Sequence, residues 1–127
     1  MQRFSSGSEF EGRIGYSRSV LCDGWVFVSG TTGYDYETMT LPDGIEAQCQ
    51  AALDNLARAL EAAGSGMDRV ARVTYMLPDR ADFPACWPLL RAAWGASAPA
   101  ATMIECGLME PAMRIEIEVT ARLREGR

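Results

Sequence analysis

The sequence predicts an α+β domain in which two helices cover one face of a mostly antiparallel sheet. Runs of alternating apolar and polar residues, typical of strands, interleave with two segments whose apolar residues recur at helical spacing. Along the chain the order is two or three strands, a helix, a strand, a second helix and two strands. Placing both helices on one side of the sheet is the simplest arrangement for this order.

A β-hairpin is predicted before the first helix. Residues 16–21 and 25–29 are rich in β-forming side chains and flank Asp23 and Gly24, a dipeptide typical of tight turns between strands. The Gly-Thr-Thr-Gly segment over residues 30–33 is expected to end the second strand.

The longer helix is predicted to begin at Ile45 and to end at Gly64, a residue typical of helix C-termini. The polar stretch over residues 34–44 before it is expected to be a surface loop. One face of the helix is apolar and is expected to cover a sheet. This face consists of Ile45, Cys49, Ala52, Leu53, Leu56, Leu60 and Ala63. A β-rich run over residues 70–77 follows.

The second helix is marked by four apolar residues at helical spacing, with Asp82 as its predicted N-cap and Gly95 at its end. The apolar residues are Phe83, Trp87, Leu90 and Trp94. Pro84 fits the first turn of a helix, whereas Pro88 is expected to kink its interior.

Two strands are predicted to close the chain, over residues 100–106 and 113–123. In the second of these, apolar residues alternate with polar ones over eleven positions, so one strand face is expected to pack against the helices. The other sheet face carries Trp25, Phe27 and Met103, a larger apolar area than a monomeric protein usually leaves exposed to water. We therefore expect the protein to form an oligomer.

A chain of 127 residues has the usual size of one globular domain, and we expect a single domain over residues 1–127. No apolar run approaches the roughly 18 residues of a membrane-spanning helix. The first residues lead into no apolar stretch of the signal-peptide kind. We therefore expect a cytoplasmic protein that does not contact a membrane.

The composition limits the chemistry of the protein. The sequence contains no histidine and no lysine, since all 12 basic residues are arginine. This excludes Ser-His and Cys-His dyads, pyridoxal phosphate bound to lysine, and the P-loop, so we expect neither a metal nor another cofactor. Catalysis must rely on carboxylates, arginines, hydroxyls, thiols, backbone groups and water. The net charge of −5 disfavours nucleic-acid binding.

The four cysteines are far apart in the sequence and lack the close pairing of metal or redox sites. They are Cys22, Cys49, Cys86 and Cys106. We expect them to be small core residues in a reducing compartment. For Cys106 a functional thiol stays open as an alternative, because this residue follows the segment that is expected below to line a cleft.

Several strings in order resemble the RidA/YjgF family, also called the YjgF or liver perchloric-acid-soluble protein family. They are I-G-Y-S at 14–17, where the family has a proline before the tyrosine, V-S-G at 28–30, A-Q-C-Q-A-A-L-D-N-L at 47–56, E-A-A-G at 61–64, P-A-A-T-M-I-E-C at 99–106 and I-E-I-E-V at 115–119. The resemblance implies a chorismate-mutase-like α+β fold. It also implies a homotrimer whose sheets form a central barrel, with small-molecule clefts between the subunits.

The resemblance also implies a chemistry. In the best-known members the cleft hydrolyses 2-imino or 2-enamino acids to 2-keto acids and ammonia. An arginine in the string P-A-R-S holds the substrate carboxylate, and the first glutamate of I-E-I-E, Glu116 here, positions the attacking water. This chain has Ala101 where the resemblance implies the arginine. We therefore expect no inherited 2-imino acid deamination unless Arg18 or Arg114 replaces that anchor.

Glu116 is the candidate catalytic residue, with a merely solvated strand face as the alternative interpretation. The candidate ligand-binding residues are Tyr16, Gly30, Thr31, Trp87, Ala101 and Met103. Tyr16 is expected to donate a hydrogen bond to the ligand or to pack at a subunit boundary. If Trp87 and Met103 line the cleft rather than the core, they favour an aromatic or uncharged ligand. Glu105 is expected to form a structural ion pair.

Three functions remain open at this point. The first is a divergent hydrolase that acts on a small C=N or activated carbonyl compound through water activated by Glu116. The second is a non-catalytic trimer that binds a small metabolite or a protein partner through the same clefts. The third is the endoribonuclease activity claimed for some relatives, which the acidic charge and the absence of histidine and lysine disfavour.

Overall fold

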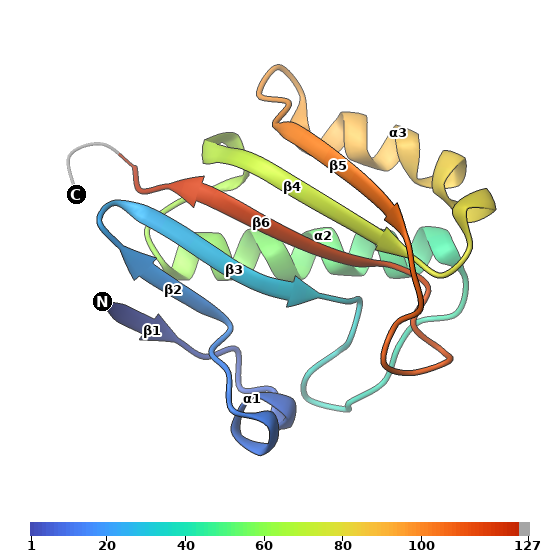
Figure 1. Cartoon of the computed structure of the whole chain (residues 1–127), viewed down its shortest axis with the longest axis horizontal. Coiled ribbons are helices and arrows are strands. Elements are labelled where there is room, and N and C mark those ends of the chain that lie inside the picture. Colours follow the sequence, from blue (N-terminus) through green and yellow to red (C-terminus); the bar gives the residue numbers. More distant parts are fainter. Residues whose placement is uncertain (125–127) are drawn as a thin grey trace.

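The computed structural model describes residues 1–124 and shows a six-stranded sheet with two long helices against one face (Figure 1). Its elements are β1 (Gln2–Phe4), α1 (Glu9–Ile14), β2 (Ser19–Cys22), β3 (Trp25–Thr31), α2 (Ile45–Ala62), β4 (Val70–Leu77), α3 (Phe83–Trp94), β5 (Ala100–Glu105) and β6 (Glu116–Arg122). Single 3₁₀ turns, Met67–Arg69 and Arg80–Asp82, precede β4 and α3. The last three residues of the expected domain, 125–127, lie outside the described part of the chain.

The strand order is β1-β2-β3-β6-β4-β5. Neighbouring strands are antiparallel except β4 and β5, which are parallel because α3 carries the chain back between them. A mostly antiparallel sheet with two long helices is the α+β fold that the sequence predicted.

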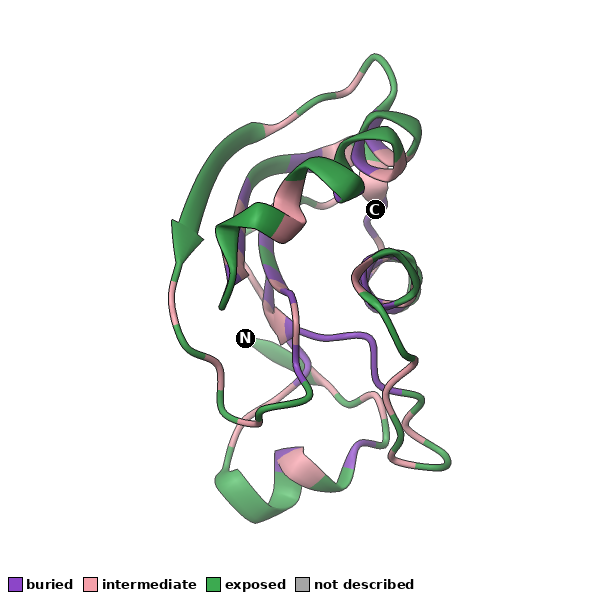
Figure 2. Cartoon of the chain, turned by 90° about the vertical axis from the view of Figure 1, so that its right-hand side faces the viewer, coloured by how far each residue is buried: buried purple, intermediate pink, exposed green. Residues whose placement is uncertain are grey.

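The core lies between the sheet and the two long helices, and Figure 2 shows α2 and α3 on the same side of the curved sheet. The apolar face predicted for the longer helix is confirmed, since all but one of its residues are buried and Ile45 packs against the same cluster. Leu56 and Leu60 are fully buried, as are Val26 of β3 and Ile117 of β6. The opposite sheet face has no such cover, and Trp25 and Phe27 stay 37% and 48% exposed there.

Near the N-terminus the structure adds two elements that were not predicted. β1 and α1 contain three and six residues, too few to show a clear period in the sequence. The Ser8 hydroxyl caps α1 by accepting a hydrogen bond from the backbone N–H of Phe10. Gly15 ends the helix with φ of 101°, in the left-handed region that glycine adopts readily. The chain reverses there and leads into Tyr16.

The predicted hairpin is confirmed, but its strand ends differ from the prediction. β2 begins at Ser19 rather than at residue 16, and the side chain of Arg18, just before the strand, is buried. β3 does not end at residue 29 but continues through Gly30 to Thr31. Its pairing with β6 is irregular between Val28 and Thr31, as in the bulges that often lie beside functional sites.

The last strand is shorter than the predicted 113–123. The backbone N–H of Arg114 donates to Gln48 Oε1 of α2 at 2.9 Å instead of to a strand, so β6 begins only at Glu116. The guanidinium of Arg114 binds both carboxylate oxygens of Asp82, at 3.2 and 2.9 Å. Asp82 is the N-cap residue of α3, as predicted, but its side chain makes no cap hydrogen bond to the helix. α3 itself runs uninterrupted through Pro88.

Met103 is not on the open sheet face, contrary to the prediction. In the parallel pairing of β4 with β5, Met103 lies beside Tyr75, whose side chain is buried under the helices. Met103 therefore faces the helix side of the sheet, although it is 56% exposed because β5 is an edge strand. The prediction that Glu105 forms a structural ion pair is confirmed, with Arg80 Nε 3.8 Å from its carboxylate.

The cysteine prediction is correct for half of the residues. Cys49 and Cys86 are fully buried, whereas Cys22 and Cys106 are only half-buried, and all four are free thiols. Within residues 1–124 no helix is both long enough and apolar enough to cross a membrane.

Candidate functional site

A cavity of about 610 Å³ lies where β3 ends and β6 begins. Residues from α1, the turn into β2, the end of β3, the following loop and the segment before β6 line it. The structure brings Tyr16, Gly30 and Glu116 together in this cavity, as the sequence predicted for a shared site.

The half-buried carboxylate of Glu116 lies directly over the backbone of Gly30. A Cβ atom at position 30 would overlap this carboxylate, so a larger residue there would push the Glu116 side chain aside. Burial raises the pKa of the Glu116 carboxyl above its ordinary value, the charge of Glu118 raises it further, and the charge of Arg18 offsets part of the rise. Glu116 makes no hydrogen bond to residues 1–124, so its oxygens are free to accept from a ligand or from water.

Thr31 does not reach the cavity with its side chain, so its predicted contact with a ligand could involve only backbone groups and stays a prediction. Thr31 is fully buried, because successive residues of β3 point to opposite faces. Its hydroxyl accepts a hydrogen bond from Arg18 Nη1 at 2.9 Å and donates to the carbonyl of Ser29 at 2.8 Å. Thr31 therefore supports the cavity from below.

Arg18 is a site residue that the sequence suggested only as a substitute anchor. Its side chain is 5% exposed, yet it lines the cavity. Nη1 donates to the Gly30 carbonyl at 3.0 Å, and Nη2 donates to the Tyr16 hydroxyl at 3.2 Å. Nε lies 3.7 Å from the carboxylate of Glu11 and makes no hydrogen bond. The signal in the sequence was a charged residue within a β-rich run.

The negative partner of Arg18 is held ionised by its own neighbours. Glu11 is buried, and burial acts to raise its pKa, but hydrogen bonds from Ser6 and Ser5 and the charge of Arg18 outweigh this and lower the pKa of Glu11. A buried, ionised Glu11 balances the positive charge of Arg18.

A second set of hydrogen bonds ties down the loops around the cavity. The Tyr34 hydroxyl donates to Glu110 at 2.6 Å, and burial together with this bond raises the pKa of Tyr34 to about 12. The amide of Gln48 on α2 donates to the carbonyls of Pro42 and Ala112. These bonds fix the segment that leads into Glu116.

The other predicted residues lie in a different cavity. Trp87, Ala101 and Met103 line a space of about 400 Å³ between α3 and β5. Its walls are aromatic: the ring centres of Phe83 and Trp87 are 6.3 Å apart, and those of Phe83 and Tyr75 are 5.3 Å apart. Trp87 is 49% exposed, so it lines this surface cavity rather than the core.

The two groups lie on opposite faces of the sheet. Ala101 pairs with the buried Val73 and therefore faces the helix side. Glu116 alternates with the buried Ile117 and faces the open side. The predicted site residues therefore do not converge within one chain.

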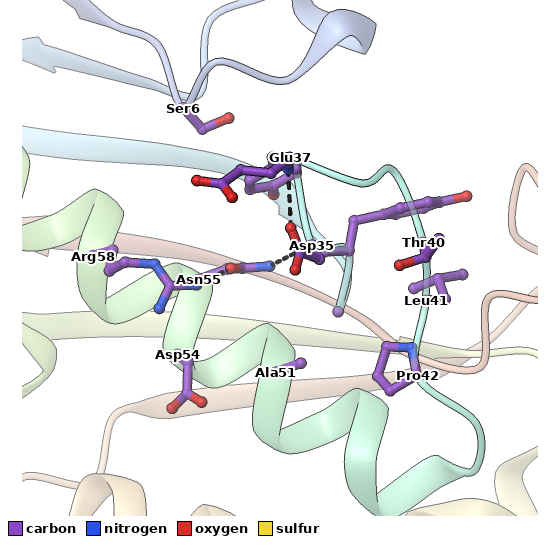
Figure 3. Close-up of a pocket in the computed structure, with 13 residues that line it drawn as sticks. Ser6, Asp35, Glu37, Thr40, Leu41, Pro42, Ala51, Asp54, Asn55 and Arg58 are labelled. Carbon is purple, nitrogen blue, oxygen red and sulfur yellow. Dashed lines mark hydrogen bonds between the residues drawn. The ribbon is translucent and has the colours of Figure 1, made fainter.

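A third cavity, of about 710 Å³, lies between the loop after β3 and α2 (Figure 3). Its polar side chains mostly bind the protein itself. Buried Asn55 donates to the carbonyls of Thr32 and Tyr34, and Arg58 donates to Asn55. Asp35 accepts from the backbone N–H of Glu37 at 2.9 Å. We interpret these side chains as structural, because their hydrogen bonds hold the loop after β3 against α2.

Comparison with known proteins gave consistent matches. The family model described as Endoribonuclease L-PSP matches residues 7–123. The RutC family protein UK114 of Drosophila melanogaster is 36% identical over 107 residues, which cover 84% of this chain and 78% of that protein. The 2-iminobutanoate/2-iminopropanoate deaminase of Rattus norvegicus is 32% identical over 123 residues, which cover 95% of this chain and 90% of that protein.

Solved structures show the same fold. A member of the YjgF/YER057c/UK114 family from Mycobacterium tuberculosis superposes with a TM-score of 0.87 at 34% identity, covering 96% of this chain and 98% of that chain. RidA from the Antarctic bacterium Psychrobacter sp. superposes with a TM-score of 0.88 at 26% identity, covering 97% and 100%.

Proposed function

Because the chain belongs to the Endoribonuclease L-PSP family, which includes the RidA/YjgF proteins, we propose that it hydrolyses a small C=N or activated carbonyl compound with water activated by Glu116. The observation that carries this proposal is the unbonded, half-buried carboxylate of Glu116 over Gly30, in a cavity of about 610 Å³. A relative that is 32% identical is named an imine deaminase, which supports the reaction class.

The proposed reaction needs a base that passes one proton at a time. Water adds to the imine carbon while Glu116 accepts one of its protons and returns it to the nitrogen, giving a carbinolamine. The hydroxyl proton of this intermediate then passes through Glu116 to the nitrogen, the C–N bond breaks, and a carbonyl compound and ammonia leave. A carboxylate with a raised pKa suits both transfers, because a group whose pKa is nearer to neutral pH both accepts and returns a proton readily.

The substrate is proposed to differ from the 2-imino acids of the relatives. Ala101 stands where the family resemblance implies the arginine that anchors the substrate carboxylate. Arg18 is not proposed as the replacement, because three of its donors bind Gly30, Thr31 and Tyr16 and its unbonded Nε is buried beside Glu11. Arg114 is bound to Asp82. Ribonuclease activity is not proposed, since the cavity carries three glutamates against one buried arginine.

A homotrimer is proposed to unite the two half-sites, with the Glu116 cavity of one subunit facing the Trp87 cavity of the next. The uncovered sheet face and the exposed edge strand β5 support this assembly. Light scattering coupled to gel filtration is expected to give three times the 13.9 kDa chain mass. Phe27→Arg on the open face is expected to give monomers, whereas Ala47→Arg on the outer face of α2 leaves the trimer intact. A monomeric wild type would overturn the shared cleft.

Gly30→Ala tests the geometry of the proposed base. The added methyl group pushes the Glu116 carboxylate aside, and a displacement of about 1 Å is expected to lower the hydrolysis rate on the order of 100-fold. Gly107→Ala is the matched control, because a Cβ atom there meets nothing within 4 Å. Initial rates with the imines described in the Discussion provide the measurement. Equal rates for the two variants would show that the position of Glu116 does not matter.

A further inference from the structure

We infer that the Glu116 cavity binds a neutral group that presents both a hydrogen-bond acceptor and an N–H donor, such as a carboxamide, rather than a carboxylate. This inference rests on the proposed function and names the substrate class of the same site. Three observations carry it: the way Arg18 is bonded, the resulting direction of the Tyr16 hydroxyl proton, and the charges that line the cavity.

The guanidinium of Arg18 cannot offer two neighbouring N–H groups to a carboxylate, because three of its five N–H groups are bonded and its unbonded Nε–H is buried beside Glu11. Nη1 binds Gly30 and Thr31, Nη2 binds Tyr16, and Nε faces the carboxylate of Glu11 at 3.7 Å. A two-pronged anchor requires two neighbouring N–H groups that both point at the ligand. Arg18 is instead a positioning residue, which holds the cavity floor and the tyrosine above it.

The bond from Arg18 fixes what Tyr16 can do. Because Nη2 donates to the phenol oxygen, the Tyr16 proton must point away from Arg18. Within residues 1–124 this hydroxyl takes part in that single hydrogen bond, and Tyr16 lines the cavity. Its proton is therefore available to an acceptor atom of a ligand, such as a carbonyl oxygen.

Glu116 offers the complementary group in the same cavity. Its carboxylate accepts no hydrogen bond from residues 1–124, and when ionised it can only accept. A ligand that satisfies both Tyr16 and Glu116 must carry an acceptor and a donor. A carboxamide has both, whereas a carboxylate has acceptors alone.

The charges of the residues that line the cavity also disfavour a ligand carboxylate. Glu110, Glu116 and Glu118 line the cavity, and Arg18, the single cation among its described lining residues, is balanced by Glu11. Arg58 on α2, which lines the neighbouring cavity, donates to Asn55. A ligand carboxylate would therefore lie among like charges without a free partner.

The test compares two probes of nearly the same shape, 2-oxobutanoate and 2-oxobutanamide, by calorimetry on the assembled protein. The amide is expected to bind about 10-fold tighter than the acid, the ratio that one hydrogen bond of about 1.4 kcal/mol produces. Tyr16→Phe is expected to remove most of this preference. Thr38→Val, which deletes a hydroxyl on the exposed loop outside the cavity, is expected to leave it unchanged.

Each other outcome overturns the inference. Equal or tighter binding of 2-oxobutanoate would show that a carboxylate anchor exists after all, for example one that a neighbouring subunit supplies. A preference that persists in Tyr16→Phe, or an amide that does not bind at millimolar concentration, would remove the role given to Tyr16. Tight acid binding together with hydrolysis that depends on Glu116 would leave the proposed function intact.

Discussion

Glu116→Gln is expected to abolish hydrolysis while the assembled protein stays folded. The amide has the size of the carboxylate but cannot take a proton from water, and loss of a general base typically costs about 10²–10⁴-fold in rate. The measurement uses 2-iminobutanoate and 2-iminobutanamide, each generated in situ, with ammonia release followed over the buffer rate. Glu61→Gln, an exposed carboxylate at the end of α2, is the control and should keep the wild-type rate. A wild type that accelerates neither imine would leave the non-catalytic binding trimer as the function.

The stability of the same variant separates a functional carboxylate from a structural one. The folded-state pKa of Glu116 is raised, mainly by burial. Its contribution to stability is therefore favourable below the ordinary carboxyl pKa and is lost as the pH rises through the folded value. Above the folded-state pKa the ionised group costs stability, so Glu116→Gln, which does not ionise, should melt at a higher temperature than the wild type there. At pH 4 the difference should disappear. A lower melting temperature at pH 7 would mark Glu116 as a structural residue.

The fold was predictable where the periodic pattern is long. The apolar pattern extends over several helical turns in α2 and over several strand residues in β4 and around Ile117. Each buried position in such a pattern supports the same secondary structure, so the prediction is secure. β1 and α1 are too short to carry such a pattern. The boundaries of β6 depend on Gln48, which captures the backbone of Arg114 from another element, and no local pattern reports such a contact.

The sequence predicted individual residues of the site but not how they are arranged. Tyr16, Gly30 and Glu116 do share a cavity, but Thr31 points the other way because the strand continues through it. The importance of Arg18 follows from its burial beside Glu11, two facts that only the folded chain reveals. The separation of Glu116 from Ala101 follows from the parallel placement of β5 beside β4, which the sequence did not specify.

Ala101→Arg is expected to give the protein a weak activity on 2-iminobutanoate, for which the wild type should show no acceleration. Ala101 is exposed on the helix side of β5, so a longer side chain can be accommodated without unfolding the core. An arginine there would restore a two-pronged carboxylate donor to the Trp87 cavity, and the proposed trimer would bring it to Glu116 of the next subunit. Phe83, Trp87 and Met103 crowd this space, and a misplacement of about 1 Å costs roughly 100-fold in rate.

The matched control is Ala100→Arg, which adds the same charge one residue earlier on β5, where successive side chains point to opposite faces. It should gain no activity, and Glu116→Gln should remove the activity of Ala101→Arg in the double variant. A trimeric Ala101→Arg that neither binds 2-oxobutanoate nor turns over the imine would show that the two cavities do not form one cleft. Because Ala101 and Glu116 lie on opposite faces of one sheet, a gain of activity that depends on both residues would require two subunits at each site.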